Sequence, residues 1–228
     1  MKKSFSIFVM VAALAMFAVP TADAQKASSF AGTVKFSVKY EGNTNPKDHI
    51  PHDEVYTIFG NKIKIVIPPW ETQILDGDAI KATILYDFPG NKCGYTVSKE
   101  YFETEQEKNN YTYVKREETK TICGYVCTRY DVTIYNTEDD EETKAIVYTT
   151  TEIGESGDIN AFEYPGLTGF PLYSETEEKG VKTIEEAILV KPTKVKALDF
   201  YVPTGYKMFP GQMEWALYMR AWQEGLKE

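Results

Sequence analysis

Alternation of apolar and polar residues is the strongest pattern in this chain. In the segment 34–40, valine, phenylalanine and tyrosine alternate with lysine and serine, which predicts a strand with one buried face. The segment 54–67 repeats the pattern on both sides of Gly60-Asn61, so we expect a hairpin there. Similar segments, separated by turn residues, follow at 80–86, 92–99, 110–121, 124–135, 143–153, 167–180 and 182–195. This succession predicts one large antiparallel sheet that curls.

A convincing helical pattern occurs only at the C-terminus, after Pro210-Gly211. Its apolar residues share one stripe at helical spacing, namely Trp215, Tyr218, Met219, Trp222 and Leu226. We expect an amphipathic helix that packs on the sheet. The alternative is a lid or a helix that binds a partner.

The segment 161–175, AFEYPGLTGFPLYSE, is aromatic and almost uncharged. Pro165-Gly166 predicts a turn, Gly169 permits a bulge, and Pro171 cannot donate a ladder hydrogen bond. The segment suits a bent strand at a sheet edge or at the mouth of a cavity. We expect a kinked core strand with ordinary packing, and the alternative is a cavity rim whose apolar side chains touch a ligand.

The N-terminus has the pattern of a secretory signal peptide. Lys2 and Lys3 precede an apolar run that ends near Ala24 in small residues, and this run is short for a membrane span. We expect residues 1–24 to be removed and residues 25–228 to form a single β-rich domain without stable membrane insertion. Gln25 stands where a lipid-anchored protein needs cysteine. The predicted location is therefore periplasmic or secreted.

The net charge of the whole chain is −9. Nucleic acids and anionic membrane surfaces attract positively charged proteins. We therefore expect neither as a partner.

Three cysteines follow the predicted cleavage site: Cys93, Cys123 and Cys127. An exported protein is free to form disulfides, but the odd number leaves at least one thiol unpaired. Four extended residues separate Cys123 from Cys127 by more than a disulfide can bridge. We therefore expect a bridge between Cys93 and either Cys123 or Cys127, or else buried thiols.

The sequence contains no motif that indicates catalysis. The two histidines, His49 and His52, are flanked by aspartates, but Pro46 and Pro51 favour a polar loop over a zinc site. The acidic run 137–143 lacks the ligand pattern of a calcium loop and resembles a hairpin tip. Paired carboxylates depend on distances in space, which spacing in the sequence does not give. We expect a protein that is not an enzyme and that uses no metal and no cofactor.

Three segments carry a resemblance to a known family: TICGYVCTRYDV, EYPGLTGFPLYSE and KVKALDFYVPTGYKMF, within residues 121–209. In this order they resemble a family of secreted bacterial proteins defined by a domain of unknown function. That family in turn resembles the periplasmic lipoprotein-carrier fold. The resemblance implies a mainly β fold with a single strongly curved antiparallel sheet, a half-barrel, around an apolar cavity, closed here by the C-terminal amphipathic helix.

Two functions are compatible with this fold. The first is a binding protein that holds a lipid, an acyl chain or a lipoprotein in the concave sheet. Its predicted ligand-binding residues are Leu167 and Phe170 at the rim and Trp215, Met219 and Trp222 above the cavity. The second is a cell-envelope module that docks another protein through its sheet edge or aromatic helix. An enzyme comes third, and convergent carboxylates in a cleft would favour it.

Overall fold

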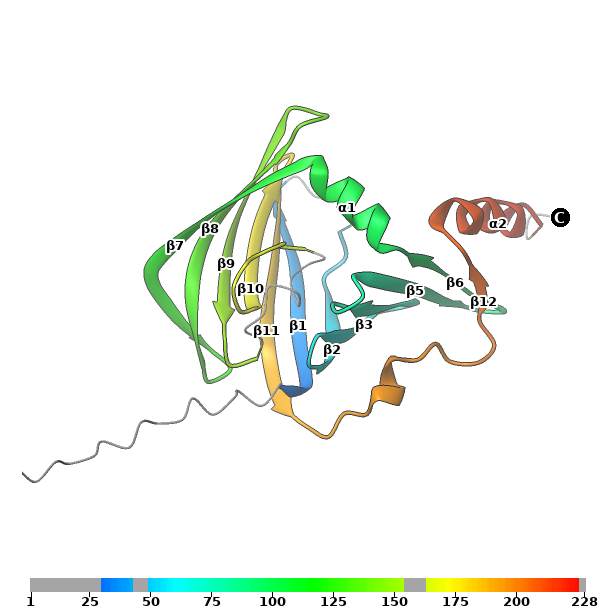
Figure 1. The fold of residues 1–228 in the computed structure, drawn as a ribbon, viewed down its shortest axis with the longest axis horizontal. Helices are drawn as coiled ribbons and strands as arrows, with labels where there is room; N and C mark the ends of the chain where they lie inside the picture. Colours follow the sequence, from blue (N-terminus) through cyan, green and yellow to red (C-terminus); the bar gives the residue numbers. More distant parts are fainter. Residues whose placement is uncertain (1–29, 43–48, 154–162, 226–228) are drawn as a thin grey trace, which may run out of the picture.

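The protein forms one open sheet of twelve strands, described in a computed structural model for residues 30–42, 49–153 and 163–225 (Figure 1). The strands are β1 (Ala31–Gly42), β2 (His52–Phe59), β3 (Lys62–Ile67), β4 (Glu71–Asp76), β5 (Lys81–Phe88), β6 (Asn91–Val97), β7 (Asn109–Ile122), β8 (Tyr125–Asn136), β9 (Glu141–Thr150), β10 (Phe170–Glu178), β11 (Val181–Pro192) and β12 (Lys207–Phe209). Their order in space is β12-β6-β5-β4-β3-β2-β1-β11-β10-β9-β8-β7. The predicted signal peptide, residues 1–24, and Leu226 lie outside the described residues.

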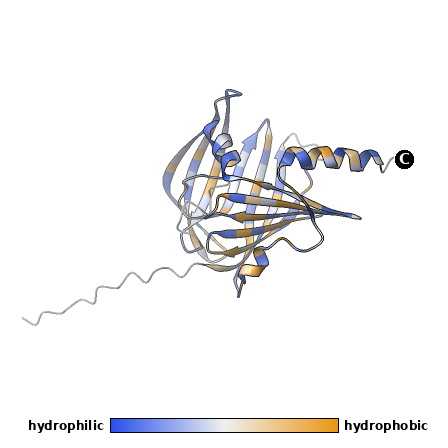
Figure 2. Ribbon diagram, turned by 45° about the vertical axis from the view of Figure 1, so that its right-hand side comes forward, coloured by the Kyte–Doolittle hydropathy of each residue, from blue (hydrophilic) through white to orange (hydrophobic). Residues whose placement is uncertain are grey.

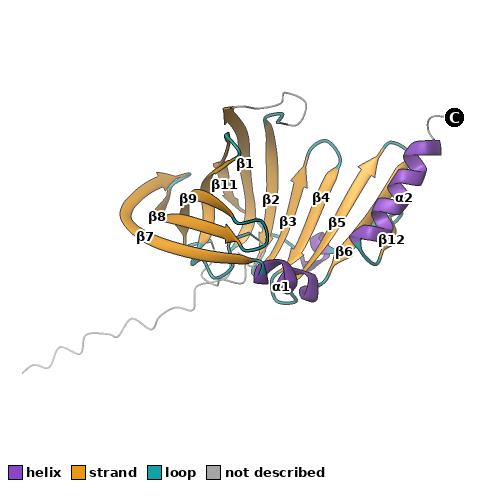
Figure 3. Cartoon of the chain, turned by 90° about the horizontal axis from the view of Figure 1, so that it is seen from above, coloured by secondary structure: helices purple, strands orange, loops and turns teal. Residues whose placement is uncertain are grey.

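Strand β1 joins two series of hairpins, because it pairs with β2 on one side and β11 on the other. All neighbouring strands are antiparallel except β12, which lies parallel to β6. Figure 3 shows the sheet bending from β6 round to β7, with α1 (Lys99–Glu107) on its inner side. We call the side of the sheet that carries Phe36, Tyr56 and Ile65 the inner face.

Side-chain burial confirms the alternation predicted from the sequence. Val34, Phe36 and Val38 of β1 are buried, whereas the residues between them are partly exposed. Figure 2 shows the same banding of hydrophobic and hydrophilic residues along the strands. The predicted mainly β fold, its large antiparallel sheet and its C-terminal helix, α2 (Gln212–Gly225), are confirmed.

Helix α1 was not predicted from the sequence. It follows Ser98, and an ion pair between Lys99 and Glu103 links successive turns, an arrangement that stabilises an isolated helix slightly. Its sequence is mostly polar, so it has only a narrow apolar stripe and lacks the pattern of an amphipathic helix. Among the described residues no helix has the length and apolarity to cross a membrane.

The aromatic segment 161–175 forms a strand from Phe170 onward, but this strand is not at an edge of the sheet. Strand β10 lies between β9 and β11, so the edge position that the proline suggested is wrong. The register with β9 shifts between Pro171 and Tyr173, and this bulge accommodates a proline that has no N–H to donate. The predicted turn at Pro165-Gly166 is present, with Gly166 at φ +82.

The strand predicted to begin at Gly124 starts one residue later. Cys123 and Gly124 form the two-residue turn between β7 and β8, with φ values of 51 and 90. Positive φ at both turn residues matches the twist of the flanking strands. Cys123 therefore lies at a hairpin tip, and only Cys127 belongs to the strand.

Candidate functional site

A cavity of about 470 Å³ lies on the inner face of β2–β6, bordered by α1 and by the start of α2. Pockets that hold small ligands are of this size and are mostly apolar. The cavity is lined by Glu54, Tyr56, Ile65, Ile67, Gln73, Leu75, Ala82, Ile84, Tyr95, Val97, Tyr101, Phe102, Glu163 and Gln212.

Strand pairing explains why apolar side chains line this cavity. Antiparallel partners point to the same side of a sheet, so each register row places one side chain per strand on the inner face. One such row crosses four strands as Ile65, Gln73, Ile84 and Tyr95, and the next crosses them as Ile63, Leu75, Ala82 and Val97. These two rows form the floor of the cavity.

A second, inner pocket of about 60 Å³ adjoins the cavity. The two share Tyr56, Ile65, Leu75 and Glu163 as lining residues. This volume holds a few water molecules or a chemical group of similar size.

Three aromatic rings pack against one another in the inner pocket. The ring centroids of Phe36 and Tyr56 are 4.6 Å apart, and Phe170 lies 6.3 Å from Phe36 and 6.4 Å from Tyr56. The pocket is also lined by Glu163, Ser174 and Glu185. Polar and aromatic groups thus converge on one small space.

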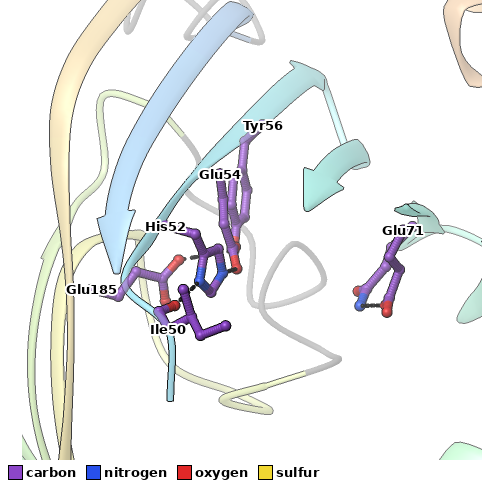
Figure 4. Close-up of polar contacts among 7 residues, drawn as sticks. Ile50, His52, Glu54, Tyr56, Glu71 and Glu185 are labelled. Atoms are coloured by element: carbon purple, nitrogen blue, oxygen red, sulfur yellow. Dashed lines mark hydrogen bonds and ion pairs between the residues drawn. The ribbon is translucent and has the colours of Figure 1, made fainter. Parts of the chain in front are cut away.

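A chain of hydrogen bonds runs from His52 through Glu54 and Tyr56 to Glu185 (Figure 4). His52 Nε2 lies 2.9 Å from Glu54 Oε1, and the Tyr56 hydroxyl lies 3.3 Å from Glu54 Oε2 and 3.0 Å from Glu185 Oε1. The Tyr56 hydroxyl has one proton to donate, but two carboxyls lie within hydrogen-bond distance of it. A proton on one of the carboxyls completes the second hydrogen bond.

Glu185 accepts a hydrogen bond from the Tyr56 hydroxyl, and its environment disfavours the ionised form. Burial and the charges of the nearby Glu163 and Glu54 together raise the pKa of Glu185 to about 8, although hydrogen bonds from Tyr56 and Ser174 act to lower it. Burial also raises the pKa of the Tyr56 hydroxyl well above its usual value, so Tyr56 stays protonated.

His52 supplies the positive charge beside Glu54. Its Nδ1 lies 2.9 Å from the carbonyl oxygen of Ile50, while Nε2 faces the Glu54 carboxylate. Burial acts to lower the pKa of His52, but these two acceptors outweigh it and the pKa is raised above 6.5. Two acceptors for two ring nitrogens favour the doubly protonated imidazolium.

Glu163 is a third carboxyl close to Glu54 and Glu185. Much of the residue is solvent-exposed, and it lines both the cavity and the inner pocket. Burial raises the pKa of Glu163, a hydrogen bond with Tyr164 opposes this, and the charge of Glu54 raises it further. The pKa values of Glu163 and Glu185 are therefore both raised, in part by the charge of Glu54.

Two of the predicted ligand-binding residues lie against opposite walls of the cavities. Phe170 lines the inner pocket and packs on Tyr56. Trp215 of α2 lies 5.2 Å from the ring of Tyr95, which lines the larger cavity. Helix α2 thus borders the cavity at one end and Phe170 borders it at the other.

The other three predicted residues pack outside both cavities. Leu167 is buried in a separate cluster over β7–β9 with Val132, Ala145, Val147 and Tyr164. Met219 is buried against Asn91 and Cys93 of β6, and Trp222 stacks on Phe88 at 5.9 Å. Leu167 thus anchors the loop before β10, and Met219 and Trp222 anchor α2.

The predicted disulfide is not formed in the structure, where all three cysteines are free. Cys93 on β6 lies beside Met219, with 3.6 Å between the sulfur atoms. Cys123 and Cys127 belong to the β7–β8 hairpin at the other end of the strand order. Burial raises the pKa of the Cys127 thiol to about 11, which matches the alternative of buried thiols for this residue.

The two histidines do not form a metal site together. His49 packs its ring edge-on against Tyr40, whereas His52 faces Glu54. Throughout the described ranges, no three histidine, cysteine or acidic side chains are grouped to hold an ion. The acidic run 137–143 spans the β8–β9 hairpin tip, as predicted.

Glu54, Tyr56 and Glu185 were not predicted from the sequence, although the alternation of β2 and β11 carried a signal for the two carboxyls. Glu54 and Glu185 occupy the same alternation as the apolar inner-face residues Ile58 and Ala187 of their strands. A carboxyl in the apolar register of a strand is the feature that would have singled them out.

Comparison with known proteins gives distant structural likenesses alone. No family model matches the chain, and no curated protein matches it. A solved structure described as PNGF-II is similar at a TM-score of 0.50 and 13% identity, covering 79% of this chain and 31% of that chain. This chain therefore spans less than a third of the length of that protein, and the likeness concerns the fold alone.

Proposed function

We propose that this protein is an exported, non-enzymatic binding protein that holds an apolar or amphipathic molecule, such as a lipid or an acyl chain, in the inner-face cavity. The observation that carries this proposal is the cavity of about 470 Å³, whose floor consists of two rows of mostly aliphatic side chains. Burying about 200 Å² of acyl chain is worth about 5 kcal/mol at ~25 cal/mol per Å² before the costs of binding.

We further propose that the bent sheet is a half-barrel of the lipoprotein-carrier kind. Its open strand order and the bend in Figure 3 support this proposal, as does the position of α2 against β5 and β6. Trp215 stacks on Tyr86 with 4.8 Å between the rings, and Gln212 at the start of α2 lines the cavity, so the helix borders one end of it.

Native mass spectrometry of the protein purified from its host tests the proposal directly. We expect a co-purified ligand with the mass of a lipid or fatty acid. Calorimetric titration with decanol should then show saturable binding of one molecule per chain. Absence of both a bound ligand and any saturable titration would reject the binding function.

Acid–base catalysis is a second candidate, because Glu54, Glu163 and Glu185 converge on one wall. Carboxyls whose surroundings separate their pKa values are the groups that act as acid and base in enzymes. The Tyr56 hydroxyl lies between Glu54 and Glu185 and bonds to both, so each of these carboxyls already has a hydrogen-bond partner within the protein. We therefore place binding first.

Chromogenic aryl glycosides, assayed between pH 5 and pH 8, provide the test of this second function. Turnover that is lost in both Glu54→Gln and Glu185→Gln would make the protein an enzyme. No turnover with any of these glycosides would reject glycoside cleavage and leave the binding function in place.

A further inference from the structure

The inner pocket combines aromatic faces with carboxyls in a way that indicates the charge of its occupant. Phe36, Tyr56 and Phe170 contribute three mutually packed rings, and Glu163 and Glu185 lie among the lining residues. Aromatic faces attract cations, and pockets of several rings hold ammonium groups in many proteins. The aromatic rings and the carboxyls are thus two independent features that favour the same charge.

The carboxyls of Glu163 and Glu185 receive hydrogen bonds from neutral donors. Tyr56 and Ser174 bond to Glu185, and Tyr164 bonds to Glu163. The His52 ring faces Glu54, and Lys120 pairs with Glu186 while its Nζ lies 4.4 Å from the ring centroid of Tyr173. Within the described parts of the chain, no lysine or arginine forms an ion pair with either carboxyl.

We propose that the inner pocket binds the ammonium head of a single-chain alkylamine, whose chain extends into the adjoining cavity past Tyr56, Ile65 and Leu75. This inference rests on the proposed binding function and names the class of its ligand. The shared lining residues make the pocket and the cavity one continuous space.

Each alternative head group fits this pocket less well. A carboxylate head would oppose the ionisation of Glu163 and Glu185 and would form no ion pair with either of them. A hydroxyl head can bond to the same groups but gains no attraction from the rings. An ammonium donates charge-assisted hydrogen bonds to the carboxyls and contacts the aromatic faces. When it binds, the proton held by Glu185 leaves to solvent.

Calorimetric titration with three probes of equal chain length tests the inference: decylammonium, decanol and decanoate, in 150 mM salt at pH 7.5. We expect decylammonium to bind one to one and about tenfold or more tightly than decanol, and decanoate to bind more weakly than decanol. The same titrations in Glu185→Gln should reduce the preference for the amine over decanol several-fold.

Glu186→Gln is the matched control for this variant. Glu186 is the next residue of β11, and it pairs with Lys120 at 2.8 Å instead of lining the pocket. Its loss removes the same charge from an acidic protein, so the amine preference should stay as in the wild type. Should Glu185→Gln melt too early for titration, Glu163→Gln takes its place.

Each outcome separates this inference from the proposed function. Equal affinity for decylammonium and decanol would overturn the amine site and leave the apolar cavity as a binding site. Preference for decanoate, or an equal loss of amine binding in Glu186→Gln, would overturn it as well. Absence of binding by all three probes would reject the binding function itself.

Discussion

The hydroxyl of Tyr56 lies 3.0 Å from Oε1 of Glu185, although 129 positions separate the two residues in the chain. Tyr56 belongs to β2 and Glu185 to β11, and β1 lies between these strands. The bond therefore crosses over β1 and links the two series of hairpins on the inner face. Glu54 accepts from the same hydroxyl at 3.3 Å, so one oxygen connects two carboxyls.

Tyr56→Phe should destabilise the protein by about 1–3 kcal/mol, because it leaves two partly buried carboxyls without their shared donor. Urea denaturation followed by circular dichroism measures this change. Tyr135→Phe is the matched control, since the exposed Tyr135 hydroxyl bonds to Asp140, and it should cost less than about 0.5 kcal/mol. Equal costs for the two variants would contradict the importance of the Tyr56 bond.

Glu185→Gln should change how stability depends on pH. The pKa of Glu185 in the folded protein is about 8, above the ordinary value of 4.5. A raised pKa means that the contribution of Glu185 to stability is full below pH 4.5 and is lost as the pH rises toward 8. The wild type should therefore lose stability over this window by on the order of 1 kcal/mol per pH unit more than the variant does.

Denaturation curves of both proteins at pH 5, 6, 7 and 8 measure this difference. Parallel pH dependences would mean that Glu185 titrates normally in the folded protein. Glu54, Glu163 and Tyr56 face the same carboxyl, so Glu163→Gln should shift the titration of Glu185 toward lower pH.

Val97→Trp should fill the cavity and abolish ligand binding. Val97 lines the cavity at the end of β6, and an indole there occupies the space of an acyl chain. Val66→Trp is the matched control, because Val66 is 39% exposed and does not belong to the lining. Titration with decanol should show binding by the wild type and the control only, and retained affinity in Val97→Trp would place the ligand elsewhere.

Gly169→Ala should destabilise the protein more than Gly166→Ala does. Both glycines have positive φ, +84 and +82, so each alanine bears a strain of about 1–2 kcal/mol. A Cβ at Gly169 would also lie 2.9 Å from the carbonyl oxygen of Thr150, whereas a Cβ at Gly166 meets nothing within 4 Å. Equal unfolding free energies for the two variants would show that the contact with Thr150 relaxes freely.

Thiol titration with Ellman's reagent should find one reactive cysteine in the native protein and three after unfolding. Cys123 is exposed at its hairpin tip, whereas Cys93 and Cys127 are buried. Burial and the nearby Glu186 raise the pKa of Cys123, so its reaction should be slow at pH 7 and faster at pH 9. A single thiol after unfolding without reductant would demonstrate a disulfide and contradict the free state.

The sequence by itself determined most of the strands and the C-terminal helix, because both depend on local periodicity, whereas β4 and β12 were not predicted. Alternation over 34–40 predicted β1, and a stripe that includes Trp215 and Met219 predicted α2. The short polar helix α1 escaped prediction because Lys99–Glu107 has almost no apolar stripe. Pro171 suggested an edge strand, but a bulge lets this proline lie in a central strand. Periodicity does not reveal such a bulge.

Only the tertiary structure decided which residues meet. Alternation places Glu54 and Glu185 on the inner face of their own strands, but it cannot say that β2 and β11 flank β1. Their contact through Tyr56 depends on pairing across the sheet, and so does the distance between Cys93 and Cys127. Strand periodicity is a property of neighbouring residues, whereas convergence of side chains on a cavity is a property of strand order and sheet curvature.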